Sequence, residues 1–261
     1  MPSDPLEEFA RVVHVLDRLL DPEKGCPWDL KQTPPTARLY FLEEAYEMLA
    51  AAEGDDPAEL RAELGDCLFM LLFLIRLYER QGVLDLGRVL GGAADKMISR
   101  HPHVFGEGRA LSSAEEVKEQ WNKIKRREKK DSVLAGVPRN LPALLRAHRL
   151  TERAGRTGFD WDGAGSVLET LDQETAELKA AIGAGREREA AAELGDVLFT
   201  LANLARHLGF NAEDALRGTN DRFARRFAYI EEKLIEKGRL PEEASLKEMD
   251  ELWAEAKARG L

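Results

Sequence analysis

The chain has 261 residues and a mass of 29.2 kDa, which suits one large domain or two domains of about 130 residues each. Apolar residues make up 44% and charged residues 33%. This composition is typical of a soluble globular protein and excludes collagen-like and disordered chains. The net charge of -10 argues against broad binding to nucleic acid, because such binding depends on cations that neutralise phosphates.

Membrane spans and disulfides are not expected either. The longest apolar run, from Cys67 to Ile75, ends at Arg76 after nine residues, whereas a spanning helix needs about 20. The N-terminus carries acidic residues instead of a basic, apolar leader, so we expect a cytoplasmic protein without a secretory signal. The only two cysteines, Cys26 and Cys67, are too few for a disulfide framework.

Helical periodicity dominates the sequence. Apolar residues recur three and four positions apart along most of the chain, and strand signals are almost absent, so the sequence predicts an all-α protein. In chain order, the expected helices of the first half span residues 5–20, 36–53, 57–80, 84–100 and 113–130. Those of the second half span residues 141–156, 165–182, 186–208, 212–238 and 245–258.

The second half repeats the first. Residues 44–47 (Glu-Ala-Tyr-Glu) return as residues 174–177 (Glu-Thr-Ala-Glu), displaced by 130 positions. Residues 63–66 (Glu-Leu-Gly-Asp) return unchanged as residues 193–196, displaced by the same 130 positions. A repeat of this length indicates duplication of a whole domain, because solenoid units are only about 20 to 50 residues long.

The boundary between the two copies is expected near residue 135, where a basic helix end gives way to Gly136 and Pro138. The first domain then covers residues 1–135 and the second covers residues 136–261. No aromatic residues interleave the basic residues 123–130, so we interpret them as a solvated helix end and not as a nucleic-acid patch.

Each copy is expected to place four carboxylates on a helical hairpin. Glu44 and Glu47 are three residues apart, as are Glu63 and Asp66, so each pair lies on one helix face. The turn sequence 54–57 joins the two helices and puts Glu47 and Glu63 at one level, roughly 9 to 10 Å from the turn. The second copy repeats this arrangement with the carboxylates Glu174, Glu177, Glu193 and Asp196.

Facing carboxylates need a cation between them. Like charges near 5 Å repel by roughly 3 kcal/mol per pair at an effective dielectric constant of 20. Oxygen ligands without a His or Cys cluster favour Mg²⁺, with Mn²⁺ as an alternative, and a di-iron site would need Glu-x-x-His motifs. Solvated surface glutamates are the other interpretation, but the apolar surroundings and the recurrence of the same gap favour two metal sites.

Two pairs of cations follow the hairpins. Lys96 and Arg100 are four residues apart on one expected helix, and Arg222 and Arg226 recur after the second hairpin. Residues with this spacing share a helix face, so each pair can hold one phosphate. A metal site together with paired cations predicts a polyphosphate-binding site, whereas either pair alone is also compatible with a solvated helix surface.

Several motifs together resemble the MazG family of nucleoside triphosphate pyrophosphohydrolases. They are Gly-Cys-Pro-Trp-Asp at residues 25–29, Glu-Glu-Ala-Tyr-Glu at 43–47, Glu-Leu-Gly-Asp at 63–66 and Arg-His-Pro-His-Val-Phe-Gly at 100–106. The resemblance covers nearly the whole chain and implies tandem all-α domains of the four-helix-bundle type that assemble as a homodimer. It also implies Mg²⁺-dependent hydrolysis of NTPs and dNTPs to the monophosphate and pyrophosphate, through attack of an activated water at the α-phosphorus.

The resemblance further implies roles for individual residues. In the second domain the metal ligands, and with them the catalytic centre, correspond to Glu174, Glu177, Glu193 and Asp196. In the first domain the matching ligands are Glu43, Glu44, Glu47, Glu63 and Asp66. The nucleotide contacts correspond to Arg222, Arg226 and Trp253, with Lys96 and Arg100 at the positions of the arginines in the first domain. Gln173 replaces Glu43 in the second copy, so a fifth ligand is in doubt there.

Other interpretations stay open. His101 and His103 are candidate general bases, but Phe227 stands where His101 would recur, which favours a structural turn. The enzyme can instead be selective for one nucleotide or for a guanosine alarmone, or one domain can be a non-catalytic nucleotide-binding or dimerisation module. We expect the second domain to be the active one, because two arginines hold phosphate bidentately.

Overall fold

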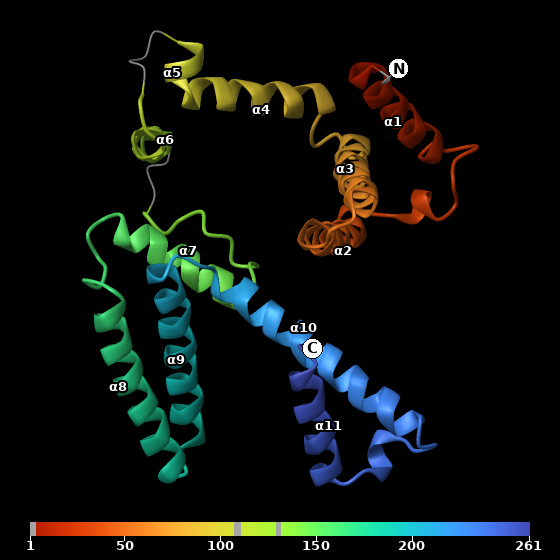
Figure 1. Cartoon of the computed structure of the whole chain (residues 1–261). Coiled ribbons are helices and arrows are strands. Elements are labelled where there is room, and N and C mark those ends of the chain that lie inside the picture. The colour runs from red at the N-terminus through yellow and green to blue at the C-terminus, as the bar shows by residue number, and fades with distance from the viewer. Residues whose placement is uncertain (1–3, 107–110, 129–131) are drawn as a thin grey trace. The chain divides into compact units, whose positions relative to one another are not determined.

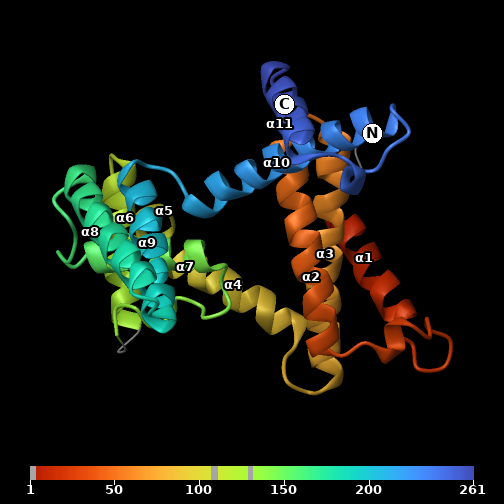
Figure 2. The same cartoon turned by 90° about the horizontal axis from the view of Figure 1, so that it is seen from below.

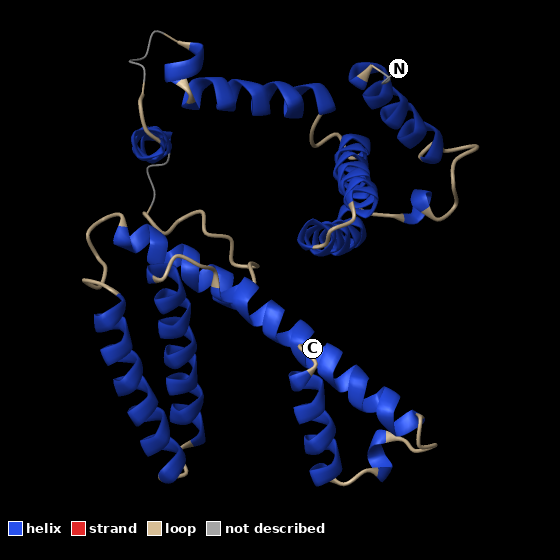
Figure 3. Cartoon of the chain, in the orientation of Figure 1, coloured by secondary structure: helices blue, strands red, loops and turns tan. Residues whose placement is uncertain are grey.

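The computed structural model describes residues 4–106, 111–128 and 132–261. Throughout these ranges the regular secondary structure is helical, and no strand occurs (Figure 3). The prediction of an all-α protein is therefore confirmed. No helix in the described residues is both long and apolar enough to cross a membrane.

The chain divides into two compact units, residues 1–128 and residues 129–261. The boundary that the sequence predicts, near residue 135, lies a few residues after the end of the first unit at residue 128. Residues 132–136 lie in the second unit. There the Arg153 guanidinium donates to the carbonyl oxygens of Ala135 and Gly136 at 2.8 and 3.1 Å. The last two positions of the helix expected over 113–130 lie outside the described residues.

The first unit consists of helices in the order predicted. They are α1 (Pro5–Leu19), α2 (Pro34–Glu53), α3 (Pro57–Arg80), α4 (Leu86–Arg100), α5 (Pro102–Phe105) and α6 (Ala114–Glu128), with a 3₁₀ turn η1 (Asp29–Lys31). Helix α3 begins sharply because Asp56 accepts a hydrogen bond from the Ala58 amide at 2.8 Å and Pro57 occupies the first turn. The chain reverses there, so α2 and α3 form an antiparallel hairpin (Figure 1).

The core of the first unit lies between α1 and α3. Leu16 of α1 and Leu72 and Phe73 of α3 are buried against one another. At the end of this contact the Arg76 guanidinium donates to Asp17 at 3.1 Å, which ties α3 to α1. The carboxylates lie nearer the hairpin turn along the same side of α3, because Asp66 precedes Phe73 by seven residues, which is two helical turns.

The second unit repeats the hairpin and has one helix before it and two after it. Its elements are α7 (Ala143–Gly155), α8 (Ala164–Gly183), α9 (Glu187–His207), α10 (Ala212–Ile235), the 3₁₀ turn η2 (Pro241–Glu243) and α11 (Leu246–Ala258). Helices α8 and α9 form the hairpin, α7 packs on α9, and α11 packs on α10 (Figure 1 and Figure 2). Ile230, Leu234 and Leu252 are the buried core of the α10–α11 contact.

Candidate active site

Each hairpin brings three of its four predicted carboxylates together. In the first unit, oxygens of Glu44, Glu63 and Asp66 all lie within 4.8 Å of one another. In the second unit the corresponding group consists of Glu174, Glu177 and Glu193, again within 4.8 Å. Each group joins carboxylates of both helices of its hairpin, and it leaves out Glu47 in the first unit and Asp196 in the second. Both hairpins therefore form an acidic cluster.

The two clusters have the same pattern of exposure. Glu44 and Glu63 are half-buried, whereas Glu47 and Asp66 are exposed, and every counterpart in the second unit falls in the same class as its equivalent. One glutamate from each helix therefore sits at the base of the cluster, while a second carboxylate from each helix lies at its solvent edge. Glu43 is exposed, as is Gln173 at the corresponding position.

The carboxylates repel one another in both units. Partial burial raises the pKa of Glu44 above its ordinary value, and the negative charges of Glu47 and Asp66 raise it further. Glu63 has a raised pKa for the same two reasons. In the second unit burial and the neighbouring carboxylates raise the pKa of Glu174 and of Glu193. Within the described residues no Lys or Arg pairs with any of these carboxylates.

These donors fit a divalent cation. The Oε2 atom of Glu63 is buried and has no hydrogen-bond partner in the described part of the chain, which is costly for a carboxylate unless a cation contacts it. The ligands are oxygens only, the set that Mg²⁺ and Mn²⁺ prefer. Each cluster therefore has the donor atoms and the charge that a metal site of this kind requires, and the first also has an unsatisfied buried oxygen.

The recurrence of Arg and Trp in the repeat also has a structural meaning. The Arg226 guanidinium lies 5.4 Å from the centroid of the Trp253 ring, and the Arg100 guanidinium lies 5.4 Å from that of Trp121. Both are cation–π contacts, and the same pairing occurs in each unit. The sequence placed these residues in the repeat but gave no indication that they touch. Arg222 is exposed and donates to Thr219 at 2.9 Å, and Lys96 is exposed.

In the second unit the cationic residues do not lie against the carboxylates. Glu193 and Asp196 occupy the half of α9 next to the hairpin turn, whereas α10 begins beyond the other end of α9 and leads away from the hairpin (Figure 1 and Figure 2). In both views α11, which carries Trp253, lies apart from α8 and α9. The structure thus forms the carboxylate cluster and the Arg226–Trp253 pair separately within one unit.

The two histidines belong to a packed turn. The Nδ1 atom of His101 lies 2.6 Å from the carbonyl oxygen of Met97, one turn earlier in α4. The His101 ring contacts the Trp121 ring edge-on at 4.9 Å between centroids and lies 5.6 Å from the His103 ring. These contacts support the structural interpretation of His101 at the end of α4.

Together the fold and the site define a class of protein, namely tandem all-α proteins whose helical hairpins each carry a carboxylate cluster suited to a divalent cation. The chain belongs to the MazG family. The family model of the MazG nucleotide pyrophosphohydrolase domain matches residues 32–105 and again residues 163–229. Each match contains one complete hairpin, so the predicted family, the duplication and the class of enzyme are confirmed.

Relatives match over nearly the full length. A nucleoside triphosphate pyrophosphohydrolase of Escherichia coli (strain K12) is 38% identical over 265 aligned residues, which cover 98% of this chain and 99% of the relative. A Thermotoga maritima protein named nucleoside triphosphate pyrophosphohydrolase/pyrophosphatase MazG is 36% identical over 252 residues, with 95% of each chain covered. A nucleoside triphosphate pyrophosphohydrolase of Mycolicibacterium smegmatis is 31% identical over 219 residues, covering 74% of this chain and 66% of the relative.

Proposed function

We propose that the chain hydrolyses nucleoside triphosphates, both NTPs and dNTPs, to the nucleoside monophosphate and pyrophosphate, with Mg²⁺ as its cofactor and Mn²⁺ as a substitute. The observation that carries the proposal is the carboxylate cluster of each hairpin, which has no basic partner in the described residues. The cluster of the first hairpin also contains the buried, unsatisfied Oε2 atom of Glu63. The divalent cations that accompany a triphosphate would supply the positive charge that such a cluster lacks.

The residues have distinct roles in this proposal. In the second unit the metal would be held by Glu174, Glu177, Glu193 and Asp196, and in the first unit by Glu43, Glu44, Glu47, Glu63 and Asp66. When bound, the metal ion supplies Lewis-acid chemistry and neutralises phosphate charge. Glu174, whose pKa is raised by burial and by Asp196, is our candidate to accept a proton from the attacking water. Arg222 and Arg226 bind the phosphates, and Trp253 faces the base.

We further propose that the enzyme is a homodimer. Leu64, Leu68 and Leu71 form a stripe along α3, and Leu194, Leu198 and Leu201 form the equivalent stripe along α9. These six side chains are between 41 and 51% exposed. Spacings of four and three residues place each stripe on one helix face beside the carboxylates. A stripe repeated at the same positions in both units favours coverage by a second copy, which would also bring cationic side chains to the carboxylates.

Product analysis tests the proposed reaction. The purified protein is incubated with a panel of NTPs and dNTPs, with Mg²⁺, with Mn²⁺ and with EDTA, and the products are separated by ion-exchange chromatography. We expect several substrates to yield monophosphate and pyrophosphate in equal amounts, and EDTA to abolish turnover. Formation of diphosphate and orthophosphate, or no turnover with either metal, would overturn the proposal. Turnover of one nucleotide or of a guanosine alarmone alone would favour the selective alternatives.

A further inference from the structure

Helix α11 ends in a motif that fixes the position of one main-chain oxygen, that of Leu261. The Gly260 amide donates to the Lys257 carbonyl, and the Leu261 amide donates to the Ala256 carbonyl, both at 3.1 Å. Gly260 has a φ of 83°, in the left-handed region that residues with a Cβ rarely adopt. This pair of bonds is a Schellman motif, and it holds Leu261 against the end of the helix.

A main-chain oxygen of Leu261 accepts a hydrogen bond from Arg226. The Arg226 Nε atom on α10 donates to it at 2.7 Å. The face of the same guanidinium lies over the Trp253 ring, and that ring lies 5.3 Å from the ring of Phe223 between centroids. One edge and one face of the guanidinium are therefore fixed, while Nη1 and Nη2 have no hydrogen-bond partner in the part of the chain that the structure describes.

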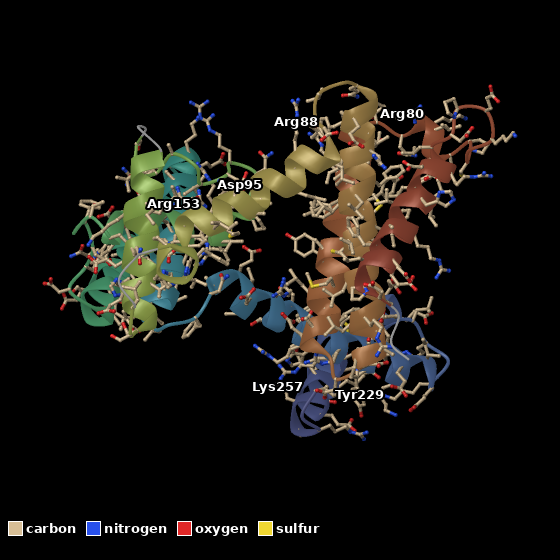
Figure 4. All side chains as sticks on the ribbon, turned by 90° about the horizontal axis from the view of Figure 1, so that it is seen from above. Arg80, Arg88, Asp95, Arg153, Tyr229 and Lys257 are labelled. Carbon is tan, nitrogen blue, oxygen red and sulfur yellow. The ribbon has the colours of Figure 1, made fainter. Side chains whose placement is uncertain are left out.

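The contact between α10 and α11 holds this oxygen of Leu261 beside Arg226. The Tyr229 hydroxyl of α10 donates to Glu255 of α11 at 2.6 Å, and Arg259 donates to the same carboxylate at 2.7 Å. The Arg259 guanidinium also lies 5.0 Å from the centroid of the Tyr229 ring. Figure 4 labels Tyr229 and Lys257 in this region, where α10 and α11 meet. The end of α11 is thus held on the helix that carries the arginine.

We propose that the Gly260–Leu261 cap is a positioning element for phosphate recognition. A guanidinium has donors on Nε and on both Nη atoms, arranged in a rigid plane. Because the Nε donor is occupied by Leu261, the guanidinium turns its Nη1–Nη2 edge outward, and that edge can bind two oxygens of one phosphate. The inference rests on the proposed function, in which Arg226 binds the triphosphate.

Substitution of Gly260 tests the role of the cap. Gly260→Val disfavours the left-handed conformation and displaces the main-chain oxygen of Leu261. The KM for nucleotide should therefore rise about tenfold, as expected for one charge-assisted hydrogen bond, with kcat little changed. Gly260→Asn should keep the wild-type KM within about twofold, because Asn tolerates this backbone conformation. An unchanged KM in Gly260→Val would overturn the inference.

A matched control separates positioning from general loss of stability. Gly238 has a φ of 67° and ends α10 with the same pair of bonds, from its amide to Ile235 and from the Arg239 amide to Leu234. Gly238→Val should lower stability to a similar degree and leave the KM unchanged. In an Arg226→Gln background, Gly260→Val should raise the KM no further, since the group that the cap positions is gone. Multiplicative effects of the two changes would contradict the proposal.

An NMR measurement does not depend on turnover, so it tests the role of the cap separately from the proposed reaction. In ¹⁵N NMR spectra the hydrogen-bonded Arg226 Nε–H should give a slowly exchanging resonance that is lost in Gly260→Val and in Arg226→Lys and retained in Gly238→Val. Magnesium pyrophosphate should shift this resonance. A protein without hydrolytic activity that still shows these effects would refute only the proposed reaction, whereas an Nε–H resonance unaffected by Gly260→Val would refute only the role of the cap.

Discussion

Asp160 shows how one side chain orders the entry to the second hairpin. Its Oδ1 atom accepts a hydrogen bond from Arg206, lies 3.0 Å from His207 Nε2 and accepts from the Trp161 amide at 3.0 Å. Burial opposes ionisation of this carboxyl, but the hydrogen bonds from Arg206 and His207 outweigh it and hold the pKa of Asp160 below its ordinary value of 3.8. The loop before α8 is thereby attached to the end of α9.

The lowered pKa gives a pH-dependent contribution to stability. A carboxyl with a lower pKa in the folded state stabilises the fold above its unfolded pKa of 3.8, and this contribution is lost as the pH falls through the folded value. Asp160→Asn should therefore lower the free energy of unfolding by about 2 kcal/mol at pH 7 and by much less near pH 2. Urea denaturation at both pH values measures the difference. The exposed neighbour Asp162, changed to Asn, is the control; equal losses at both pH values in Asp160→Asn would contradict the assignment.

At the scale of elements, the two hairpins are near copies. Helices α2 and α3 reproduce the exposure pattern of α8 and α9 at every carboxylate. They differ in the residues that follow them, since the second unit has Arg222 and Arg226 where the first has Lys96 and Arg100. A guanidinium binds two phosphate oxygens at once, whereas an ammonium acts as a point charge. This difference is the basis for expecting more catalysis at the second hairpin.

Matched substitutions in the two hairpins test that expectation. Glu193→Gln removes one metal-ligand charge and keeps the side-chain shape, so kcat should fall roughly 10³-fold. Glu63→Gln, at the equivalent and equally half-buried position, should cost less. Steady-state kinetics with Mg²⁺ compare the two variants. Loss of turnover in Glu63→Gln with near wild-type activity in Glu193→Gln would identify the first unit as the active one, and comparable partial losses would mean that both units catalyse.

For the whole molecule, the leucine stripes on α3 and α9 are the surfaces that predict assembly. A proposed dimer buries both stripes, and a charge placed within either of them would be desolvated without a partner. Light scattering of the wild type at micromolar concentration should give twice the chain mass of 29.2 kDa. Leu68→Lys and Leu198→Lys should shift the particle towards the chain mass. Leu6→Lys, at a position on α1 that is 78% exposed, is the control. A wild-type particle of one chain mass would contradict the dimer.

Local sequence determined the helices and the carboxylate clusters. Helical periodicity and the turn residues between paired helices act over a few neighbours, so the limits of α3 and α9 agree with the predicted ranges to within one residue. Because the turn defines the register of a hairpin, the spacing of Glu44, Glu63 and Asp66 was enough to bring their oxygens together. The short helix α5 was missed, since four residues carry no periodic signal.

Only the tertiary structure decided how the cationic groups are placed. Arg226 contacts Trp253, which is 27 positions away in the sequence, and the main-chain oxygen of Leu261, which is 35 positions away. Both contacts depend on the way α11 folds back along α10. The same is true of the separation between α10 and the carboxylates of α8 and α9. Periodicity identifies which face of a helix is apolar, but the direction in which a helix leaves a turn is set by the packing of many side chains at once, which a local pattern does not encode.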